Sequence, residues 1–308
     1  MLISVCMPCY NSARFLRDSI ESVLAQDYPD YEIIVVNDES KDESRQILED
    51  YAANGVKIID QKNGGAATAR NAAYRASVGD AVLFMDTDDL ILPNHLSSLA
   101  ARLTEPSVIT MGQWDRFYSD PAEATFPVRE TYRDAPGFDW IIEGGWGMMQ
   151  SAMFLVPRKL IELYGPWNER RSPIDDMEFY TRIISRCSRL RFIPEARVFY
   201  RSGLDGSLSG GNSRVHVEGR LLSLIDATSH LLRVKDDPEC RLFCANMLQR
   251  FHYDFYPYHP DLRAFARKRV SALGGATCEP SGSPKFQTLR KYVGWRMARR
   301  LQHAYRRG

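Results

Sequence analysis

The first third of the chain alternates short apolar runs with segments in which apolar residues recur every three to four positions. The short runs are apolar on both faces, which is typical of strands buried in a parallel sheet. The amphipathic segments between them predict helices that cover this sheet. We therefore expect strands over 2–8, 31–37, 56–60, 80–85 and 107–112, and helices over 12–25, 42–54 and 66–77.

The pattern changes after the first third of the chain. The segment 113–215 is rich in aromatic residues, Gly and Pro, and its regular structure is harder to predict. From residue 216 onward the apolar positions again recur with a helical period. We expect an α/β half over 1–112, a second half of the same domain over 113–215, and a helical C-terminal region over 216–308.

Composition and charge disfavour several classes of protein. A hydrophobic fraction of 44% predicts an ordinary folded core, and a formal net charge of +1 gives no overall attraction to nucleic acid. No apolar stretch approaches the ~20 residues of a membrane-spanning helix. The first residues lack the basic flank and cleavage site of a signal peptide, so we expect a cytoplasmic protein. Cys6 and Cys9 fit a C-x-x-C redox motif, but the residues around them have a better explanation.

Polar clusters follow three of the predicted strands, namely Pro8–Asn11, Asn37–Ser40 and Asp86–Asp89. The carboxyl ends of parallel strands lie along one edge of a sheet, and ligands bind beyond that edge. We therefore expect the three clusters to meet at a single site. Their convergence is a stronger indication of function than any one motif.

The triplet Asp86-Thr87-Asp88 places two carboxylates on alternate residues directly after a buried strand. Such carboxylates can share one hard divalent cation, because Mg²⁺ and Mn²⁺ prefer oxygen ligands and keep positions open for phosphate and water. The cation would offset the charge that develops on a diphosphate leaving group. The alternative interpretation is a solvated acidic turn that caps the next helix.

Two further clusters suit a nucleotide. The carboxylate of Asp38 could accept a hydrogen bond from a ring N–H of a nucleobase, although the segment could also be a simple turn. Gly64 and Gly65 open a helix of small residues, and Arg70 could meet a phosphate, hold a carboxylate of the same edge or lie on the surface. The chain has neither a P-loop nor a G-x-G-x-x-G motif after the first strand, which disfavours a dinucleotide-dependent oxidoreductase.

The segment Asp175–Glu178 brings three acidic residues to the start of a predicted helix. Acidic residues suit a helix N-terminus because of the helix dipole alone. The functional interpretation is a general base, since sugar transfer to a hydroxyl needs a group that accepts the hydroxyl proton.

Five segments carry these residues in a fixed order: Pro8–Asn11, Val36–Asp42, Asn63–Asn71, Phe84–Asp89 and Asp175–Phe179. Over about residues 2–210 they resemble the family 2 glycosyltransferases. The resemblance implies the GT-A fold, an α/β fold with a Rossmann-like, mostly parallel central sheet flanked by helices. It also implies an inverting transferase that moves a sugar from a nucleotide-diphosphate donor, a UDP-sugar favoured, to a hydroxyl of a glycan or lipid-linked acceptor. The half over 1–112 would then bind the nucleotide-sugar, and the half over 113–215 would bind the acceptor.

The same resemblance assigns roles to individual residues. Asp176 would be the catalytic base, and Asp88 would bind a divalent cation, Mn²⁺ or Mg²⁺, with Asp86 near the ribose or the metal. The donor nucleotide would be contacted by Pro8, Tyr10, Asn11, Asp38, Gly65, Arg70 and Asp86. The sugar, the acceptor or a lid would involve Trp146, Asp175, Glu178 and Ser207.

One departure from the family concerns the metal. Many members carry a His shortly after the position of Tyr200, where this chain has Gly203. By the resemblance, Asp205, Ser207 or a water would then complete the ligands of the metal. The Gly-rich stretch that contains these residues is either a lid that orders on donor binding or a plain connector.

The segment 285–307 contains eight basic residues and no acidic one, with apolar and aromatic residues between them. A helix of this kind can lie on an anionic membrane surface, or it can pack on the domain with a solvated basic face. Two other functions stay open beside glycosyl transfer: a non-catalytic nucleotide-sugar-binding protein and a nucleotidyltransferase. Residues 8–14 lack the Gly-rich, basic loop that a nucleotidyltransferase needs.

Overall fold

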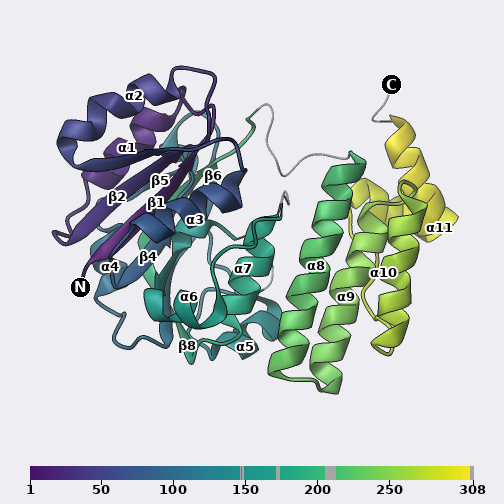
Figure 1. Ribbon diagram of the computed structural model, residues 1–308. Helices are drawn as coiled ribbons and strands as arrows, with labels where there is room; N and C mark the ends of the chain where they lie inside the picture. Colours follow the sequence, from purple (N-terminus) through teal and green to yellow (C-terminus); the bar gives the residue numbers. More distant parts are fainter. Residues whose placement is uncertain (146, 148, 171–173, 205–212, 306–308) are drawn as a thin grey trace. The chain divides into compact units, whose positions relative to one another are not determined.

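The computed structural model describes residues 1–145, 147, 149–170, 174–204 and 213–305. The chain divides into two compact units (Figure 1). The first unit comprises Met1–Arg171 and Phe179–Ser207, and the second comprises Ser172–Glu178 and Leu208–Gly308. The first unit holds the sheet, and the second consists mainly of helices.

The first unit is built on an eight-stranded sheet with the strand order β3-β2-β1-β4-β7-β6-β8-β5. The strands β1 to β4 are mutually parallel where they pair, and β6 pairs parallel with β8. The short strands β5 and β7 pair antiparallel with their neighbours. Their bounds are β1 Ile3–Cys9, β2 Tyr31–Asn37, β3 Val56–Asp60, β4 Ala81–Phe84, β5 Leu90–Ile91, β6 Val108–Phe117, β7 Phe154–Pro157 and β8 Arg189–Arg201.

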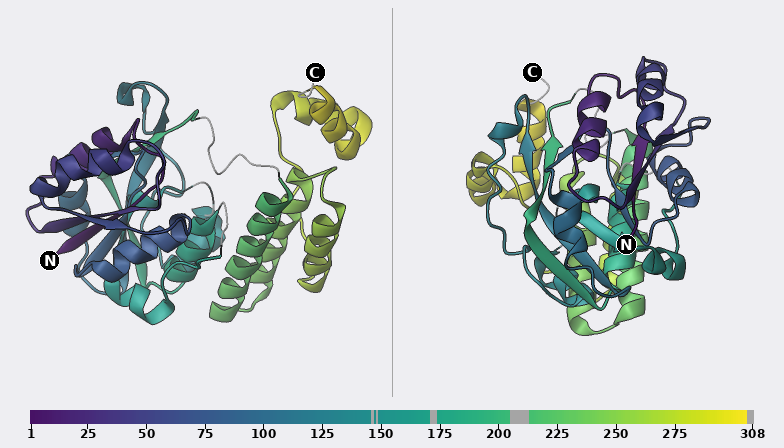
Figure 2. Two further views of the ribbon diagram at one scale, coloured as in Figure 1. Left: turned by 45° about the horizontal axis from the view of Figure 1, so that its top comes forward. Right: turned by 90° about the vertical axis from the view of Figure 1, so that its left-hand side faces the viewer.

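Helices flank this sheet (Figures 1 and 2). In α1 the residues Leu16, Ile20 and Val23 are fully buried, and their spacing of four and three places them on one face of the helix. The Ala-rich helix α3 packs on β1 and β2, and its small side chains allow a close approach. The bounds are α1 Leu16–Leu24, α2 Ser44–Tyr51, α3 Ala66–Ala76, α4 His95–Ala100, α5 Gly137–Trp140, α6 Arg158–Tyr164 and α7 Asp175–Ile184.

The prediction of a mostly parallel α/β sheet flanked by helices is confirmed, although single elements differ. The strand expected over 107–112 is longer, because β6 continues to Phe117 alongside β8. The helix expected over 12–25 begins only at Leu16, after backbone N–H groups of the preceding loop have bonded to the loop that follows β2.

Beneath the carboxyl end of β4 lies a cluster of aromatic side chains. The rings of Trp167 and Phe179 stack with their centroids 4.1 Å apart, and Phe84 meets both edge-on. All three side chains are buried, and aromatic contacts of this kind add about 0.5–1.5 kcal/mol each beyond simple burial. The cluster therefore gives the end of β4 a rigid support.

Within its described residues, the second unit contains four long helices, α8 Arg214–Val234, α9 Pro238–Asp254, α10 Pro260–Ala272 and α11 Pro284–Tyr305. The expected helical C-terminal region is thus confirmed. Trp295 of α11 packs edge-on against Tyr253 and Tyr256, with ring centroids 4.9 and 5.0 Å apart. No helix in the described part of the chain is long and apolar enough to cross a membrane.

Candidate functional site

The three polar clusters meet at the carboxyl edge of β1, β2 and β4, as predicted. The hydroxyls of Ser12 and Thr87 lie 2.8 Å apart, and the Thr87 hydroxyl donates to the carbonyl oxygen of Pro8 at 3.2 Å. The backbone N–H of Asp38 donates to the carbonyl oxygen of Cys9 at 2.8 Å. These bonds tie the loops that follow three parallel strands into one surface.

Tyr10 and Asn11 form the part of this surface that follows β1. Asn11 has a φ of 50°, a left-handed conformation that Asn tolerates better than most residues. Its side-chain carbonyl accepts a hydrogen bond from the backbone N–H of Lys41 at 2.7 Å, which fastens the loop after β2. The ring of Tyr10 is half exposed and is therefore accessible for stacking on a planar ligand.

Asp38 organises the glycine turn that precedes α3. Its carboxylate is buried and accepts hydrogen bonds from the side chain of Gln61 and from the N–H groups of Gly64 and Gly65, at 2.7, 2.8 and 2.9 Å. Gly65 has a φ of 90°, which only glycine adopts without strain. A carboxylate offers about four acceptor positions, two on each oxygen. Among the described residues, Oδ1 accepts two hydrogen bonds and Oδ2 accepts one, so Oδ2 can accept one more.

Arg70 reaches the same edge from α3. Its Nη2 lies 2.7 Å from Oδ1 of Asp86, and its guanidinium sits over the ring of Trp167, 4.5 Å from the ring centroid. The Arg70 side chain is only 6% exposed. Of the roles that the sequence left open for Arg70, the structure thus shows the contact with a carboxylate.

Asp88 and Asp89 follow on the turn after β4. Burial, and next the charge of Asp86, raise the pKa of Asp88 to about 6. Asp89 is buried, its pKa is raised by burial and by the neighbouring carboxylates, and its Oδ1 accepts a hydrogen bond from the backbone N–H of Arg201 at 3.0 Å. Crowded carboxylates of this kind favour a nearby cation.

Arg201, near the end of β8, is a residue that our sequence reasoning missed. Its Nε donates to the carbonyl oxygen of Asp88 at 3.0 Å, and its guanidinium lies between the rings of Phe15 and Phe117. Arg201 thereby holds the acidic turn against the end of β8, although Arg201 and Asp88 are 113 residues apart in the sequence. No local motif marks it.

The described residues supply some, but not all, of the protein ligands that a hard divalent cation could use. Asp86 and Asp88 supply oxygen donors, the kind that Mn²⁺ and Mg²⁺ prefer. Within the described residues, no group of three His, Cys, Asp or Glu side chains could hold a metal ion. Gly203 has a φ of 79°, and a Cβ at this position would come within 3.1 Å of the ring of Tyr118. Asp205, Ser207 and Trp146 lie outside the described residues.

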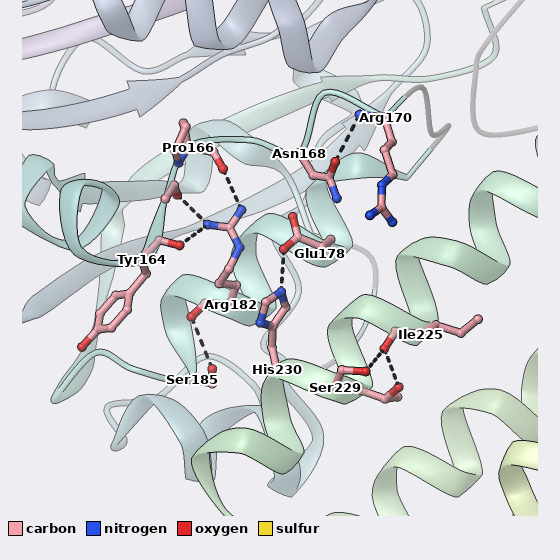
Figure 3. Close-up of polar contacts among 12 residues, drawn as sticks. Tyr164, Pro166, Asn168, Arg170, Glu178, Arg182, Ser185, Ile225, Ser229 and His230 are labelled. Carbon is pink, nitrogen blue, oxygen red and sulfur yellow. Dashed lines mark hydrogen bonds and ion pairs between the residues drawn. The ribbon is translucent and has the colours of Figure 1, made fainter.

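The acidic segment Asp175–Glu178 opens α7 and belongs to the second unit. Asp175 and Asp176 are partly exposed, whereas Glu178 is buried. The Oε1 of Glu178 lies 2.8 Å from Nε2 of His230 on α8 (Figure 3). The side chain of Glu178 is thus engaged by a helix that sequence reasoning did not connect with it.

Arg182, one turn further along α7, fixes the loop after α6. Its guanidinium donates to the carbonyl oxygens of Tyr164, Gly165 and Pro166 (Figure 3). The same loop is held from the other side, because Asn71 of α3 exchanges hydrogen bonds with the backbone of Trp167 at 2.8 and 2.9 Å. The loop therefore links α3 and α7 through buried polar contacts.

The sequence model of glycosyl transferase family 2 matches residues 4–162, and the chain belongs to this family. Among its relatives, the glycosyltransferase GlyG of Streptococcus pneumoniae serotype 4 is 30% identical over 216 residues, which cover 65% of this chain and 70% of GlyG. The uncharacterized glycosyltransferase EpsJ of Bacillus subtilis is 41% identical over 106 residues, which cover 34% of this chain and 30% of EpsJ.

Solved structures share the fold. Residues 1–349 of S. aureus TarS, in complex with UDP, superpose with a TM-score of 0.66 at 19% identity, covering 100% of this chain and 92% of that one. The mannosyltransferase PcManGT from Pyrobaculum calidifontis, in complex with GDP-Man and Mn²⁺, gives a TM-score of 0.58 at 18% identity, covering 99% and 88%. The GT-A fold expected from the sequence is thereby confirmed.

Proposed function

We propose that this chain is a metal-dependent, inverting glycosyltransferase that moves a sugar from a UDP-sugar to a hydroxyl of a glycan or lipid-linked acceptor. The observation that carries the proposal is the acidic turn after β4. There Asp88 lies beside Asp86, which is paired with Arg70, at the carboxyl edge of a parallel sheet in a member of family 2.

The donor nucleotide would lie along the edge formed by the loops after β1, β2 and β4. Tyr10 offers an accessible ring for the base, and Asp38 offers the remaining position on Oδ2 for a base N–H. Asp88, with Asp86, would hold Mn²⁺ or Mg²⁺, which supplies positive charge for the leaving diphosphate. The similar structures in complex with UDP and with GDP-Man and Mn²⁺ support this assignment.

The transfer itself would be a single displacement. The acceptor oxygen forms a bond to the anomeric carbon of the donor, on the face opposite the diphosphate. The bond between this carbon and the diphosphate oxygen breaks, and its electron pair leaves with UDP. The carboxylate of Asp176 takes the proton of the acceptor hydroxyl. One displacement inverts the configuration at the anomeric carbon.

Asp175 and Glu178 flank this base, and we assign Glu178 a positioning role. Its carboxylate is buried and meets His230 at 2.8 Å, so it holds the first turn of α7 against α8. Asp176 itself is partly exposed and its Oδ1 accepts the backbone N–H of Met177 at 2.8 Å. A partly exposed side chain on the first turn of a helix suits a base that must meet a substrate from outside.

The helix α11, which is interrupted at Gly294 with a φ of 74°, exposes apolar and basic side chains that suit an anionic membrane surface. Tyr292, Val293, Met297 and Leu301 are between 44% and 82% exposed, and Lys291, Arg296 and Arg300 are exposed beside them. By contrast, Phe286 and Arg299 of the same helix are buried within the unit. We therefore assign only these exposed side chains of α11 to a peripheral membrane contact, which would suit a lipid-linked acceptor.

The proposal is tested by comparing Asp176→Asn with the matched variant Asp175→Asn. We expect the wild type to bind UDP in the presence of Mn²⁺. It should also turn over one member of a panel of UDP-sugars slowly, and this turnover is measured as the UDP that is formed. Asp176→Asn should keep UDP affinity and lose turnover by roughly 10²- to 10⁴-fold, as expected for the loss of a general base.

Other results would select the competing functions. A wild type that binds a UDP-sugar and shows no turnover with any acceptor would be a non-catalytic binding protein. A wild type that forms a nucleotide-sugar and pyrophosphate from UTP and a sugar phosphate would be a nucleotidyltransferase. Full turnover in Asp176→Asn would place the base elsewhere.

A further inference from the structure

A cavity of about 290 Å³ opens beside the second half of β6. Its walls are mainly aromatic and thioether side chains, with one cation: Trp114, Tyr132, Trp140, Met149, Met153 and Arg129. Gly147 also lines the cavity and is exposed, so the cavity reaches the surface. The family's sequence motifs do not include these residues, and none of the roles assigned above uses them.

The walls of the cavity are fixed by hydrogen bonds between the lining residues themselves. The indole N–H of Trp140 donates to the carbonyl oxygen of Thr131 at 2.7 Å. The hydroxyl of Tyr132 accepts the backbone N–H of Trp114 at 3.0 Å and donates to its carbonyl oxygen at 3.1 Å. These bonds satisfy the polar atoms of Trp140 and Tyr132, so a ligand in the cavity would meet mainly carbon surfaces.

Arg129 gives the cavity a polar edge. Its guanidinium lies 4.3 Å from the ring centroid of Trp114, and one of its nitrogens is 3.5 Å from a carboxylate oxygen of Asp115. The nearby carboxylate offsets most of the charge, so the site has little reason to select an anion. The guanidinium can nevertheless donate hydrogen bonds to a neutral oxygen.

The position of the cavity follows from the sheet. β7 is antiparallel to both β4 and β6, so the carboxyl ends of β4 and β6 lie along the same edge. Phe117, the last residue of β6, pairs with Arg201, whose Nε donates to the carbonyl oxygen of Asp88. Trp114 meets Tyr200 of β8 edge-on, with the ring centroids 5.8 Å apart, and Tyr200 directly precedes Arg201 in the strand. The cavity therefore adjoins the part of β8 that holds the acidic turn.

We propose that this cavity binds one neutral sugar residue of the acceptor, which rests on the function proposed above. Aromatic faces suit the C–H surfaces of a pyranose ring, and Arg129 can donate to its hydroxyls. A volume of about 290 Å³ is at the low end of the ~300–1,000 Å³ of small-molecule sites, which fits a single sugar better than an acyl chain.

The test fills the cavity and measures binding of simple glycosides. Met149 is only partly buried, so Met149→Trp can place an indole in the cavity while the fold is kept. Met149→Leu preserves the volume, and Leu163→Trp adds the same indole to an exposed position on α6. Each protein is studied by saturation-transfer NMR with a panel of methyl hexopyranosides, in the presence of UDP and Mn²⁺, and UDP affinity is measured by calorimetry.

We expect saturation transfer to at least one methyl hexopyranoside in the wild type, and a loss of about tenfold or more in Met149→Trp, because the ring is excluded. Met149→Leu and Leu163→Trp should bind that glycoside like the wild type, and UDP affinity should stay within about twofold in all four proteins. Arg129→Gln should weaken the glycoside signal in the same direction.

Three results would overturn an assignment, and they are distinguishable. Glycoside binding that survives Met149→Trp, or no glycoside binding in a protein that binds UDP, would overturn the acceptor site alone. A loss of affinity for the intact UDP-sugar in Met149→Trp, with UDP affinity unchanged, would place the donor sugar in the cavity instead. A wild type that binds neither UDP nor a UDP-sugar would overturn the proposed function.

Discussion

Replacing Asp38 with Asn should destabilise the first unit and weaken donor binding together. The Asp38 carboxylate is buried and accepts three hydrogen bonds, two of them from the backbone of the glycine turn. Asn has nearly the same shape but only one acceptor oxygen. If that oxygen keeps Gln61 and Gly64, the N–H of Gly65 then faces an NH₂ group, and both are donors.

The expected loss of stability follows from these contacts. A hydrogen bond to a charged acceptor contributes about 1.5–3 kcal/mol, and leaving a buried donor unsatisfied costs a similar amount. Since the other two bonds also lose the negative charge, we expect the free energy of unfolding to fall by roughly 2–4 kcal/mol. UDP affinity should fall by about tenfold or more, because the proposed base contact meets a donor in place of an acceptor.

The assay is urea unfolding followed by tryptophan fluorescence, with calorimetry for UDP. Asp60→Asn is the matched control, since Asp60 accepts hydrogen bonds from Asn37 and Arg45 but its side chain is 53% exposed. An exposed pair contributes at most about 1 kcal/mol. If Asp38→Asn costs no more stability than Asp60→Asn, the carboxylate does not hold the glycine turn as described.

Two further predictions concern pH and membranes. Burial lowers the pKa of His95 to about 4, so the unfolded chain binds a proton below about pH 6.5 while the folded protein does not. Stability should therefore fall by roughly 3 kcal/mol as pH drops from 7 to 4, and His95→Gln should flatten this dependence in unfolding experiments across the range. Lys291→Glu with Arg296→Glu should abolish co-sedimentation with vesicles rich in phosphatidylglycerol, while Lys268→Glu on α10 should not. If the α11 double variant and Lys268→Glu bind the vesicles equally well, α11 is not the membrane contact.

Most of the sheet could be predicted from the sequence, because its central strands carry their own signal. β1, β2 and β4 are buried on both faces, and buried parallel strands are apolar along their whole length. β5 and β7 have two and four residues, too few for a period to show. The buried positions of β8 are two or three residues apart, without a regular period of two, and the strand contains Pro194, so its pairing with β6 defines it.

The candidate site likewise combines residues that the sequence predicted with residues that it did not. Asp86 and Asp88 stand on alternate residues of one short segment, so their pattern was visible, and the strand ends predicted where they would lie. The side chains that hold Asp88 and Glu178 in place come from distant segments of the chain. Arg201 is 113 residues from Asp88, and His230 is 52 residues from Glu178. Such contacts depend on tertiary packing, and a single sequence carries no local pattern for them.

The central claim is that Asp88 binds a divalent cation that in turn holds the donor diphosphate. The most direct test is calorimetric titration of UDP with and without Mn²⁺, for the wild type and for Asp88→Ala. We predict that Mn²⁺ raises the UDP affinity of the wild type by about tenfold or more, and that Asp88→Ala binds UDP equally weakly in both conditions. A variant that retains the full increase in UDP affinity with Mn²⁺ would contradict the assignment of Asp88 as a metal ligand.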